Sequence, residues 1–235
     1  MLSDAELGNI EFVRNARAKH IGVRILKSGL KVTLPGSSTP DDAMKFINSI
    51  RKKLVAKQSK LSDSIAQSNI YVDENTVLQT LSFKVVAVPT ERMNIHFLLK
   101  NELLTIQYPT HMNCRLDENQ KQFWNGISYF LRNEAKRLLP ARTLTLATKH
   151  GFTVHDVKIQ SSKTRWGSCS GMKNINFSLY LLLLPQHLVD YVILHELCHT
   201  KEMNHGPKFW AWMDKVTDGK SNALRAELKK YHMPN

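Results

Sequence analysis

The sequence predicts an α+β fold, in which a β-rich N-terminal segment with one helix precedes a mainly helical C-terminal region. Between residues 21 and 108, short apolar runs are separated by Gly, Pro and Ser turns, whereas after Asp117 apolar residues recur at helical spacing. Hydrophobic residues make up 42% and charged residues 23% of the 235 residues, which excludes a disordered chain. We therefore expect two regions, 1–112 and 113–235, and no internal repeat is apparent.

The N-terminal region is expected to contain strands around a single helix. In chain order its elements are strands over 21–26 and 30–34, a helix over 41–54, and strands over 81–88 and 93–108. The polar stretch 58–69 is expected to be either the frayed end of this helix or a linker. Lys27-Ser28-Gly29 is a short connection that suits a hairpin between the first two strands. Asp41 and Asp42 favour a helix start. The last strand is long enough to be two, with a turn at Asn101-Glu102.

The C-terminal region shows mainly helical periodicity. Its expected elements are helices over 118–138 and 141–149, strands over 154–159 and 174–184, and helices over 185–199, 207–218 and 222–231. Pro140 should end the first helix, because proline lacks the N–H that a helix interior needs. Pro185 and Pro207 fall where proline is favoured, in the first turn of a helix, and Gly219 should end the helix that Pro207 opens.

The charge distribution along the sequence indicates which kinds of partner the protein could bind. The chain has 33 basic and 20 acidic residues, and the segment 132–173 has nine basic against two acidic residues, a net charge of +7. Such a surface attracts nucleic acid, or it only keeps the protein soluble. The longest apolar run, 179–184, is far shorter than the roughly 20 residues of a membrane helix. We expect a soluble, cytoplasmic protein with no membrane partner, and nucleic acid remains a candidate partner of segment 132–173.

One motif points to chemistry. The sequence His195-Glu196-Leu197-Cys198-His199 matches HExxH. On a helix, residues four apart share a face, so both imidazoles can reach one metal ion. Glu196 is rotated by about 100° from His195, which places it beside the metal, where it can deprotonate a bound water. The alternative is a polar helix face with two structural histidines.

A catalytic zinc site needs a third protein ligand and leaves the fourth position to water. We expect this ligand to be His205, because Asn204 tolerates the left-handed conformation that would end the helix and turn the chain back. Glu202 shares the helix face of His195 and His199, but it would lie about 10 Å along the axis from His195. The sequence thus predicts one zinc ion per chain, held by His195, His199 and His205.

Four segments resemble those of the YgjP-like zinc metallopeptidases, which are related to the WLM and SprT-like zincin proteases. The segments are RWGSCS at 165–170, NIN at 174–176, YVILHELCH at 191–199 and NHGPKFW at 204–210. The resemblance is strong from about residue 118 to 216. It implies a zincin-like catalytic region, in which helices pack on a small sheet and the active-site helix carries HExxH. It also implies a zinc ion on the three histidines, with Glu196 as the catalytic base.

Three residues are candidates for contacting the substrate. Arg165 and Ser168 would line the active-site cleft, whereas the structural alternative is a packed Trp166 beside a turn or close backbone approach at Gly167. Tyr191 precedes His195 by one helical turn and could supply a second oxyanion donor, as could Arg165. The alternative for Tyr191 is a buried core tyrosine.

The expected function is hydrolysis of peptide bonds in a protein or peptide substrate by a zinc-activated water, with Glu196 as general base. Two alternatives stay open. A protease acting on DNA-associated proteins would explain the basic segment. A non-catalytic, zinc-stabilised binding module would use the same histidines, but it would need no base, and Glu196 argues against it.

Overall fold

The computed structural model describes residues 2–26, 29–58 and 71–234. The chain forms two compact units, unit 1 over residues 1–69 and unit 2 over residues 70–235, and both contain helices and strands. The α+β expectation is confirmed. The division differs from the boundary expected at 112/113, because the strands just before that position share one hydrophobic core with the helices after it.

Unit 1 contains a four-stranded sheet. Its strands are β1 (Leu2–Asp4), β2 (Gly8–Arg14), β3 (Gly22–Leu26) and β4 (Gly29–Leu34), in the order β1-β2-β4-β3. Strands β2 and β4 are parallel, and the other two pairs are antiparallel. The predicted hairpin is therefore present as β3 and β4, although residues 27–28 of its connection lie outside the described residues. Strands β1 and β2 were not predicted.

Helix α1 (Pro40–Ser49) follows this sheet. Its N-cap is Thr39, whose side chain accepts a hydrogen bond from the Asp42 N–H, while the Asp42 carboxylate accepts one from the Thr39 N–H. This reciprocal capping fixes the helix start one residue before the one expected. Residues 51–58 are also helical, and the rest of the polar stretch, 59–69, lies outside the described residues. Unit 1 has its own core, formed by Leu7, Ile10, Leu30, Val32, Leu34, Ala43, Ile47 and Leu54.

Unit 2 begins with a second four-stranded sheet. Its strands are β5 (Leu78–Gln79), β6 (Lys84–Thr90), β7 (His96–Lys100) and β8 (Leu103–Pro109), in the order β5-β6-β8-β7. The predicted long strand over 93–108 is indeed two strands with a turn. Asn101 and Glu102 have φ values of 49° and 59°, as the tight turn of a two-residue hairpin requires.

The two four-stranded sheets have the same topology. In each, the second and fourth strands are parallel, the two outer pairs are antiparallel, and a helix follows the fourth strand. No repeat was apparent in the sequence. Strand order depends on the alternation of buried residues and on turn geometry, so the same topology can arise from segments whose residues differ.

Helix α3 (Asp117–His150) is continuous over 34 residues, and the predicted break at Pro140 is wrong. A proline inside a helix costs about 3 kcal/mol. The part of α3 after Pro140 nevertheless buries Thr143, Leu146 and Ala147 in the unit 2 core, and burying one leucine side chain contributes about 1.5–3 kcal/mol. The helix ends at Gly151, whose φ of 70° gives a left-handed cap.

The remaining elements of unit 2 form a small sheet and three helices. They are β9 (Asp156–Gln160), β10 (Gly167–Cys169), β11 (Asn174–Ser178), the 3₁₀ helix η1 (Leu179–Leu183), α4 (Gln186–His199), α5 (Pro207–Val216) and α6 (Ser221–Leu228). The sheet order is β10-β11-β9, so β10 is an edge strand. The strand expected over 174–184 ends at Ser178, because the Ser178 side chain accepts a hydrogen bond from the Tyr180 N–H and caps η1. Helices α4, α5 and α6 agree with the predicted ones within a few residues.

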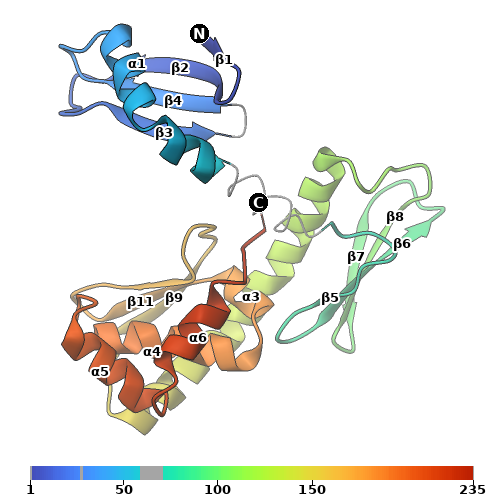
Figure 1. Ribbon diagram of the computed structural model, residues 1–235. Coiled ribbons are helices and arrows are strands. Elements are labelled where there is room, and N and C mark those ends of the chain that lie inside the picture. Colours follow the sequence, from blue (N-terminus) through green and yellow to red (C-terminus); the bar gives the residue numbers. More distant parts are fainter. Residues whose placement is uncertain (1, 27–28, 59–70, 235) are drawn as a thin grey trace. The chain divides into compact units, whose positions relative to one another are not determined.

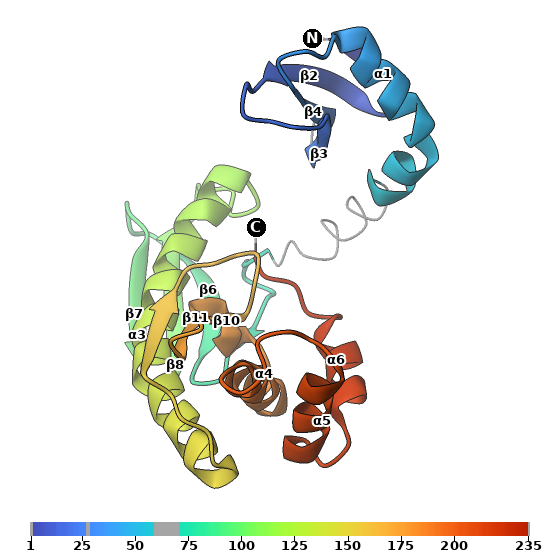
Figure 2. The same cartoon turned by 90° about the vertical axis from the view of Figure 1, so that its left-hand side faces the viewer.

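Helix α3 runs the length of unit 2 (Figures 1 and 2). The sheet β5–β8 lies on one side of it, and β9–β11 with α4–α6 lie on the other. Apolar residues from both sides join α3 in one core that includes Val85, Ile106, Ile127, Leu131 and Ile193. Among the described residues, no helix combines the length and the apolar character that crossing a membrane would require.

The contact between α3 and β7 yields a stability test. A Cβ atom added at Gly126 would overlap the ring of Phe97, which packs against the core. At an unconstrained helix position, Gly→Ala stabilises by about 1 kcal/mol. Here we expect Gly126→Ala to lower the free energy of unfolding by about 1–3 kcal/mol, as overpacking does. Asn133→Ala, at an exposed position of the same helix, should be neutral or slightly stabilising in the same urea denaturation. A stabilised Gly126→Ala would contradict this packing.

Candidate active site

Helix α4 carries the HExxH sequence into the core of unit 2. Pro185 precedes its first residue, and the helix ends at His199. Its buried residues are Leu188, Val189, Tyr191, Val192, Ile193, Leu194, Glu196, Leu197, Cys198 and His199. Because these residues cover almost every side of the helix, neighbouring elements fix its position, and with it the direction in which the motif side chains point.

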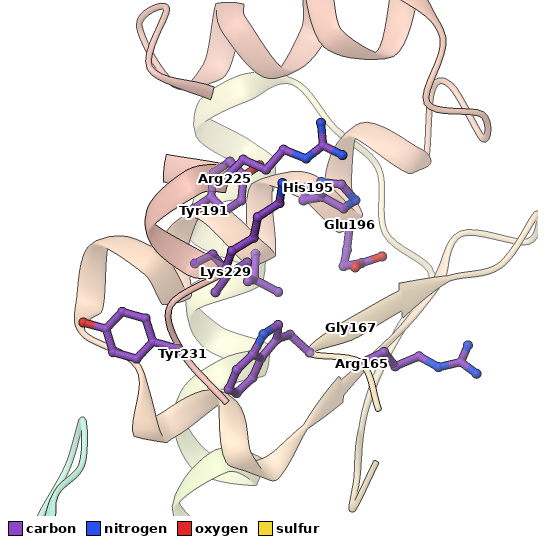
Figure 3. A pocket seen from close by; sticks show the side chains of 11 residues that line it. Arg165, Gly167, Tyr191, His195, Glu196, Arg225, Lys229 and Tyr231 are labelled. Carbon is purple, nitrogen blue, oxygen red and sulfur yellow. The ribbon is translucent and has the colours of Figure 1, made fainter. Parts of the chain in front are cut away.

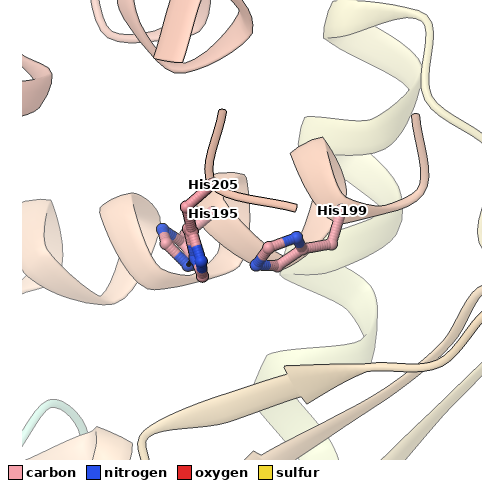
Figure 4. A group of neighbouring side chains, drawn as sticks. All are labelled: His195, His199 and His205. Atoms are coloured by element: carbon pink, nitrogen blue, oxygen red, sulfur yellow. Dashed lines mark hydrogen bonds between the residues drawn. The ribbon is translucent and has the colours of Figure 1, made fainter. Parts of the chain in front are cut away.

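Three histidine rings converge beside α4 (Figure 4). Donor atoms of His195, His199 and His205 all lie within 4.8 Å of one another, and the Nε2 atoms of His195 and His205 are 3.0 Å apart. In tetrahedral zinc sites with Zn–N bonds of 2.0–2.1 Å, two ligand nitrogens are about 3.4 Å apart. The spacing of the imidazoles therefore fits one metal ion of this kind.

The chain reaches His205 by a different path from the one predicted. Helix α4 already ends at His199, and Asn204 does not have the positive φ that we expected of it. The Gly206 N–H donates to the Asn204 carbonyl oxygen at 2.7 Å, which closes a tight turn around His205. The Trp210 Nε1 donates to the His205 carbonyl oxygen at 3.1 Å and holds this turn against α5.

Glu202 contributes through its backbone. Its carbonyl oxygen lies 3.1 Å from Nδ1 of His199, and a carbonyl can only accept, so Nδ1 carries the proton. Nε2 of His199 is then the nitrogen free to bind a metal, as in metal sites where a backbone carbonyl orients the ligating histidine. The Glu202 carboxylate is not part of the histidine cluster.

Phe209 packs against all three rings. Its ring centroid lies 4.5 Å from that of His199, 4.7 Å from that of His205 and 4.9 Å from that of His195. Phe209 is fully buried, so it forms a rigid apolar wall behind the imidazoles. In the sequence, Phe209 stood out only as part of the NHGPKFW segment at 204–210. Its proximity to the histidines depends on the turn before α5, which sequence periodicity does not reveal.

Burial sets the charge states of the ligand candidates. It lowers the pKa of His195 to about 3, with smaller contributions from His199, His205 and Arg225. Burial also lowers the pKa of His199. Both imidazoles are therefore neutral near pH 7, which is the form that binds a metal.

Glu196 is a buried carboxyl group with an unused oxygen. The residue is 5% exposed, and burial raises its pKa to about 8, opposed by the charge of Arg165. No described residue hydrogen-bonds its buried Oε2 atom. A buried carboxylate oxygen without a partner is unfavourable in a purely structural role. Next to three imidazoles, this oxygen fits a site that takes a divalent cation and a water molecule.

Strand β10 passes directly against Glu196. A Cβ atom added at Gly167 would lie 2.7 Å from Oε1 and 2.8 Å from Cγ of Glu196. Of the two roles expected for Gly167, the structure thus shows the close backbone approach. Trp166, the preceding residue, is partly buried and packs against the core.

A cavity of about 400 Å³ lies beside His195 and Glu196 (Figure 3). Arg165 and Tyr191 are among its lining residues, whereas Ser168 is not; Ser168 is paired with Asn176 of β11. Tyr191 is 3% exposed, so it is a buried wall tyrosine. The cavity also includes residues that the sequence analysis missed, namely Arg225 and Leu228 of α6 and the following Lys229 and Tyr231. They are remote from the motif in sequence and reach it only through the packing of α6 on α4.

Part of the basic segment 132–173 is neutralised within unit 2. Arg137 pairs with Glu134 on α3, and Arg142 pairs with Asp190 on α4, each at 2.6 Å. The Arg142 pair is bidentate and joins two helices. These two arginines therefore have structural partners. Glu134 is already counted in the net charge of the segment, but Asp190 lies outside it, so the Arg142 pair lowers the charge available to a nucleic acid below that net charge.

The sequence model of the YgjP-like metallopeptidase domain matches residues 19–231. The chain belongs to the YgjP-like family. It is thereby a metallopeptidase family member, and the match spans residues of both units. The resemblance seen in the sequence is confirmed, and so is the assignment to hydrolases of the protease class.

Two solved structures show limited similarity to this YgjP-like chain. One is the metallopeptidase zymogen of Pyrococcus abyssi abylysin, with a TM-score of 0.37 and 20% identity over 41% of this chain and 98% of that one. The other is the metallopeptidase zymogen of Methanocaldococcus jannaschii jannalysin, with a TM-score of 0.35 and 21% identity over 39% of this chain and 93% of that one. No curated protein matches the sequence.

The third ligand candidate can be tested by metal binding. We expect wild-type protein to bind about one zinc ion per chain and His205→Ala to weaken this binding by at least tenfold, because a protein ligand is lost. Glu202→Ala keeps the carbonyl that contacts His199, so its zinc affinity should stay within about twofold. Competition with a chromophoric chelator measures both. The reverse order of effects would exclude His205 as a ligand.

Proposed function

We propose that this YgjP-like protein is a zinc-dependent peptidase, with one zinc ion on His195, His199 and His205 and with Glu196 as general base. The observation that carries the proposal is the meeting of three imidazole nitrogens beside a buried carboxyl oxygen of Glu196 to which no described residue hydrogen-bonds. The family supports the peptidase part of the proposal. Zinc is the metal that three imidazole ligands and a fourth position left to water favour.

The protein groups have distinct roles in this mechanism. When bound in such a site, zinc makes a water molecule more acidic and polarises the scissile carbonyl. A divalent cation beside Glu196 would favour the charged form of its carboxyl group, against the effect of burial. In that form Glu196 would accept the proton of the attacking water on Oε2 and then deliver it to the leaving amine nitrogen. Its burial strengthens these electrostatic interactions by keeping solvent away. Phe209 and the Glu202 carbonyl keep the imidazoles oriented throughout the cycle.

Strand β10 offers a place for the substrate backbone. It is the edge of its sheet and runs beside Glu196. An edge strand presents unpaired N–H and C=O groups to which an extended peptide can add as a further strand. A peptide added to β10 in this way would have one of its peptide bonds next to the cluster of histidines. The open strand edge therefore favours a peptide substrate, because only a peptide backbone can pair with it.

The alternatives receive less support. A non-catalytic zinc module gives no reason to bury Glu196 without a hydrogen-bond partner for Oε2. A role on DNA-associated proteins rests on the basic segment, in which Arg137 and Arg142 are already paired with carboxylates. We therefore propose a peptidase without assigning it a nucleic-acid partner.

The general base can be tested by an isosteric change. Glu196→Gln should retain zinc and the fold, because it alters neither the three histidines nor the side-chain volume. Peptide hydrolysis should fall by about 10²–10⁴-fold, the contribution typical of general base catalysis. The assay is cleavage of a quenched fluorescent peptide library with zinc content measured in parallel. Unchanged turnover at equal zinc content would exclude Glu196 as the base.

The approach of β10 to Glu196 gives a second test with a matched control. Gly167→Ala places a methyl group against the Glu196 carboxylate, so kcat should fall by about 10²-fold, as misplacement of a reacting group by about 1 Å does. Zinc binding should be retained, because no histidine is touched. Gly171→Ala meets nothing within 4 Å and should leave kcat unchanged. Equal kcat values for the two variants would show that Glu196 does not depend on Gly167.

A further inference from the structure

The cavity beside the histidines has an unusual charge distribution for a peptide-binding site. Its cationic lining residues are Arg165, Arg225 and Lys229, and Glu196 is its single carboxylate. Trp166, Val192 and Leu228 add apolar surface to the lining. A pocket with an apolar wall and cations at one end has the composition that binds a short aliphatic stem ending in an anionic group.

Two of these cations come from the C-terminal end of α6. Arg225 and Lys229 are four residues apart, so they share one face of the helix. In Figure 3 both side chains extend from α6 toward His195, whereas Arg165 points away from it. These two cations are therefore placed to meet a group bound next to the histidines.

Neither cation is neutralised by a carboxylate of the described residues. Within the described ranges, Arg225 and Lys229 form no ion pair, although Arg51, Arg115, Arg137 and Arg142 are each paired with carboxylates. The one acidic residue of α6, Glu227, contacts Nε2 of His187 at 2.8 Å instead. The described part of unit 2 thus leaves Arg225 and Lys229, which both line the cavity, without an ion-pair partner.

Arg225 is also held in position. Its guanidinium lies over the Trp210 ring, 4.8 Å from the centroid, and stacking on an aromatic ring restricts a side chain that is otherwise mobile. Trp210 in turn donates to the His205 carbonyl oxygen, so one residue links the guanidinium to the histidine turn. A preorganised guanidinium binds a carboxylate through two parallel N–H groups and loses less entropy in doing so.

From this arrangement we infer that the cavity is a specificity pocket for a substrate carboxylate, which Arg225 binds with help from Lys229. The inference rests on the proposed peptidase function and names its substrate class, peptides with a carboxylate next to the scissile bond. The carboxylate comes either from an acidic side chain or from the C-terminus of the substrate. A basic side chain at the same position would meet two like charges and would be rejected.

Binding of matched peptides tests the pocket without requiring turnover. The protein is the zinc-loaded full chain carrying Glu196→Gln. The probes are acetylated, amidated fluorescent Ala-Leu peptides with Glu, Gln or Lys at one position, and this position is moved along the peptide. Fluorescence anisotropy should show the best Glu peptide binding about tenfold more tightly than its Gln counterpart, with the Lys peptide weakest. A second set with free C-termini and no acidic side chain distinguishes the two sources of the carboxylate.

Variants assign the preference to its residues. Arg225→Gln should abolish the tenfold difference between Glu and Gln peptides, Arg225→Lys should retain part of it, and Lys229→Gln should reduce it. Lys230→Gln removes the same charge from the next residue, which does not line the cavity, and should leave the difference intact. Equal binding of carboxylate and amide peptides in both sets, or a difference that survives Arg225→Gln, would overturn the inference.

The experiments distinguish a failure of the carboxylate-pocket inference from a failure of the peptidase proposal. If wild-type protein cleaves peptides but shows no carboxylate preference in kcat/KM, the peptidase proposal stands and the pocket inference fails. If wild-type protein binds zinc and cleaves no peptide of either set, the peptidase proposal fails. The substrate class inferred from it then fails too, whatever Arg225 contributes to binding.

Discussion

The burial of α4 is the constraint on which the rest of the site depends. Apolar neighbours surround the part of this helix that carries the HExxH motif, so His199 and Glu196 point only where the packing leaves room, toward the turn before α5 and toward β10 respectively. That enclosure keeps the imidazole of His195 uncharged and raises the pKa of Glu196. It also requires a glycine at position 167, because the strand that closes the site approaches the carboxylate more closely than any side chain would permit. The burial of α4 is thus the common cause of the neutral charge of His195, the raised pKa of Glu196 and the glycine at position 167 of β10.

The parts of this protein that local periodicity determines could be predicted from its sequence. The helices after Pro185 and Pro207 and the turn at Asn101-Glu102 depend on the spacing of apolar residues and on proline and turn preferences. The HExxH spacing likewise brings His195 and His199 to one side of a helix, whatever the fold around them. His205 could be proposed because it stands at the boundary between two helices, although the backbone path through Asn204 differs from the expected one.

The features that the sequence did not predict depend instead on contacts between segments that are distant in the sequence. Pro140 breaks an isolated helix, but here the buried face of α3 continues beyond it and the core outweighs the local preference. The division of the chain falls earlier than the change from strands to helices, because β5–β8 pack on α3. Arg225 and Lys229 belong to no recognisable sequence motif, and only the packing of α6 places them beside His195. Ser168, which belongs to a recognisable motif, is instead paired within its sheet.

The separation of the two cores has a practical consequence for spectroscopy. Each unit buries its own apolar cluster, and no residue belongs to both. All four tryptophans and all six tyrosines of the sequence lie after residue 70, in unit 2. Intrinsic fluorescence and near-ultraviolet absorbance of these residues therefore follow unit 2, and unfolding of unit 1 leaves no direct trace in them. A backbone probe such as far-ultraviolet circular dichroism detects both units, so a midpoint that differs between the two methods would reveal that they melt separately.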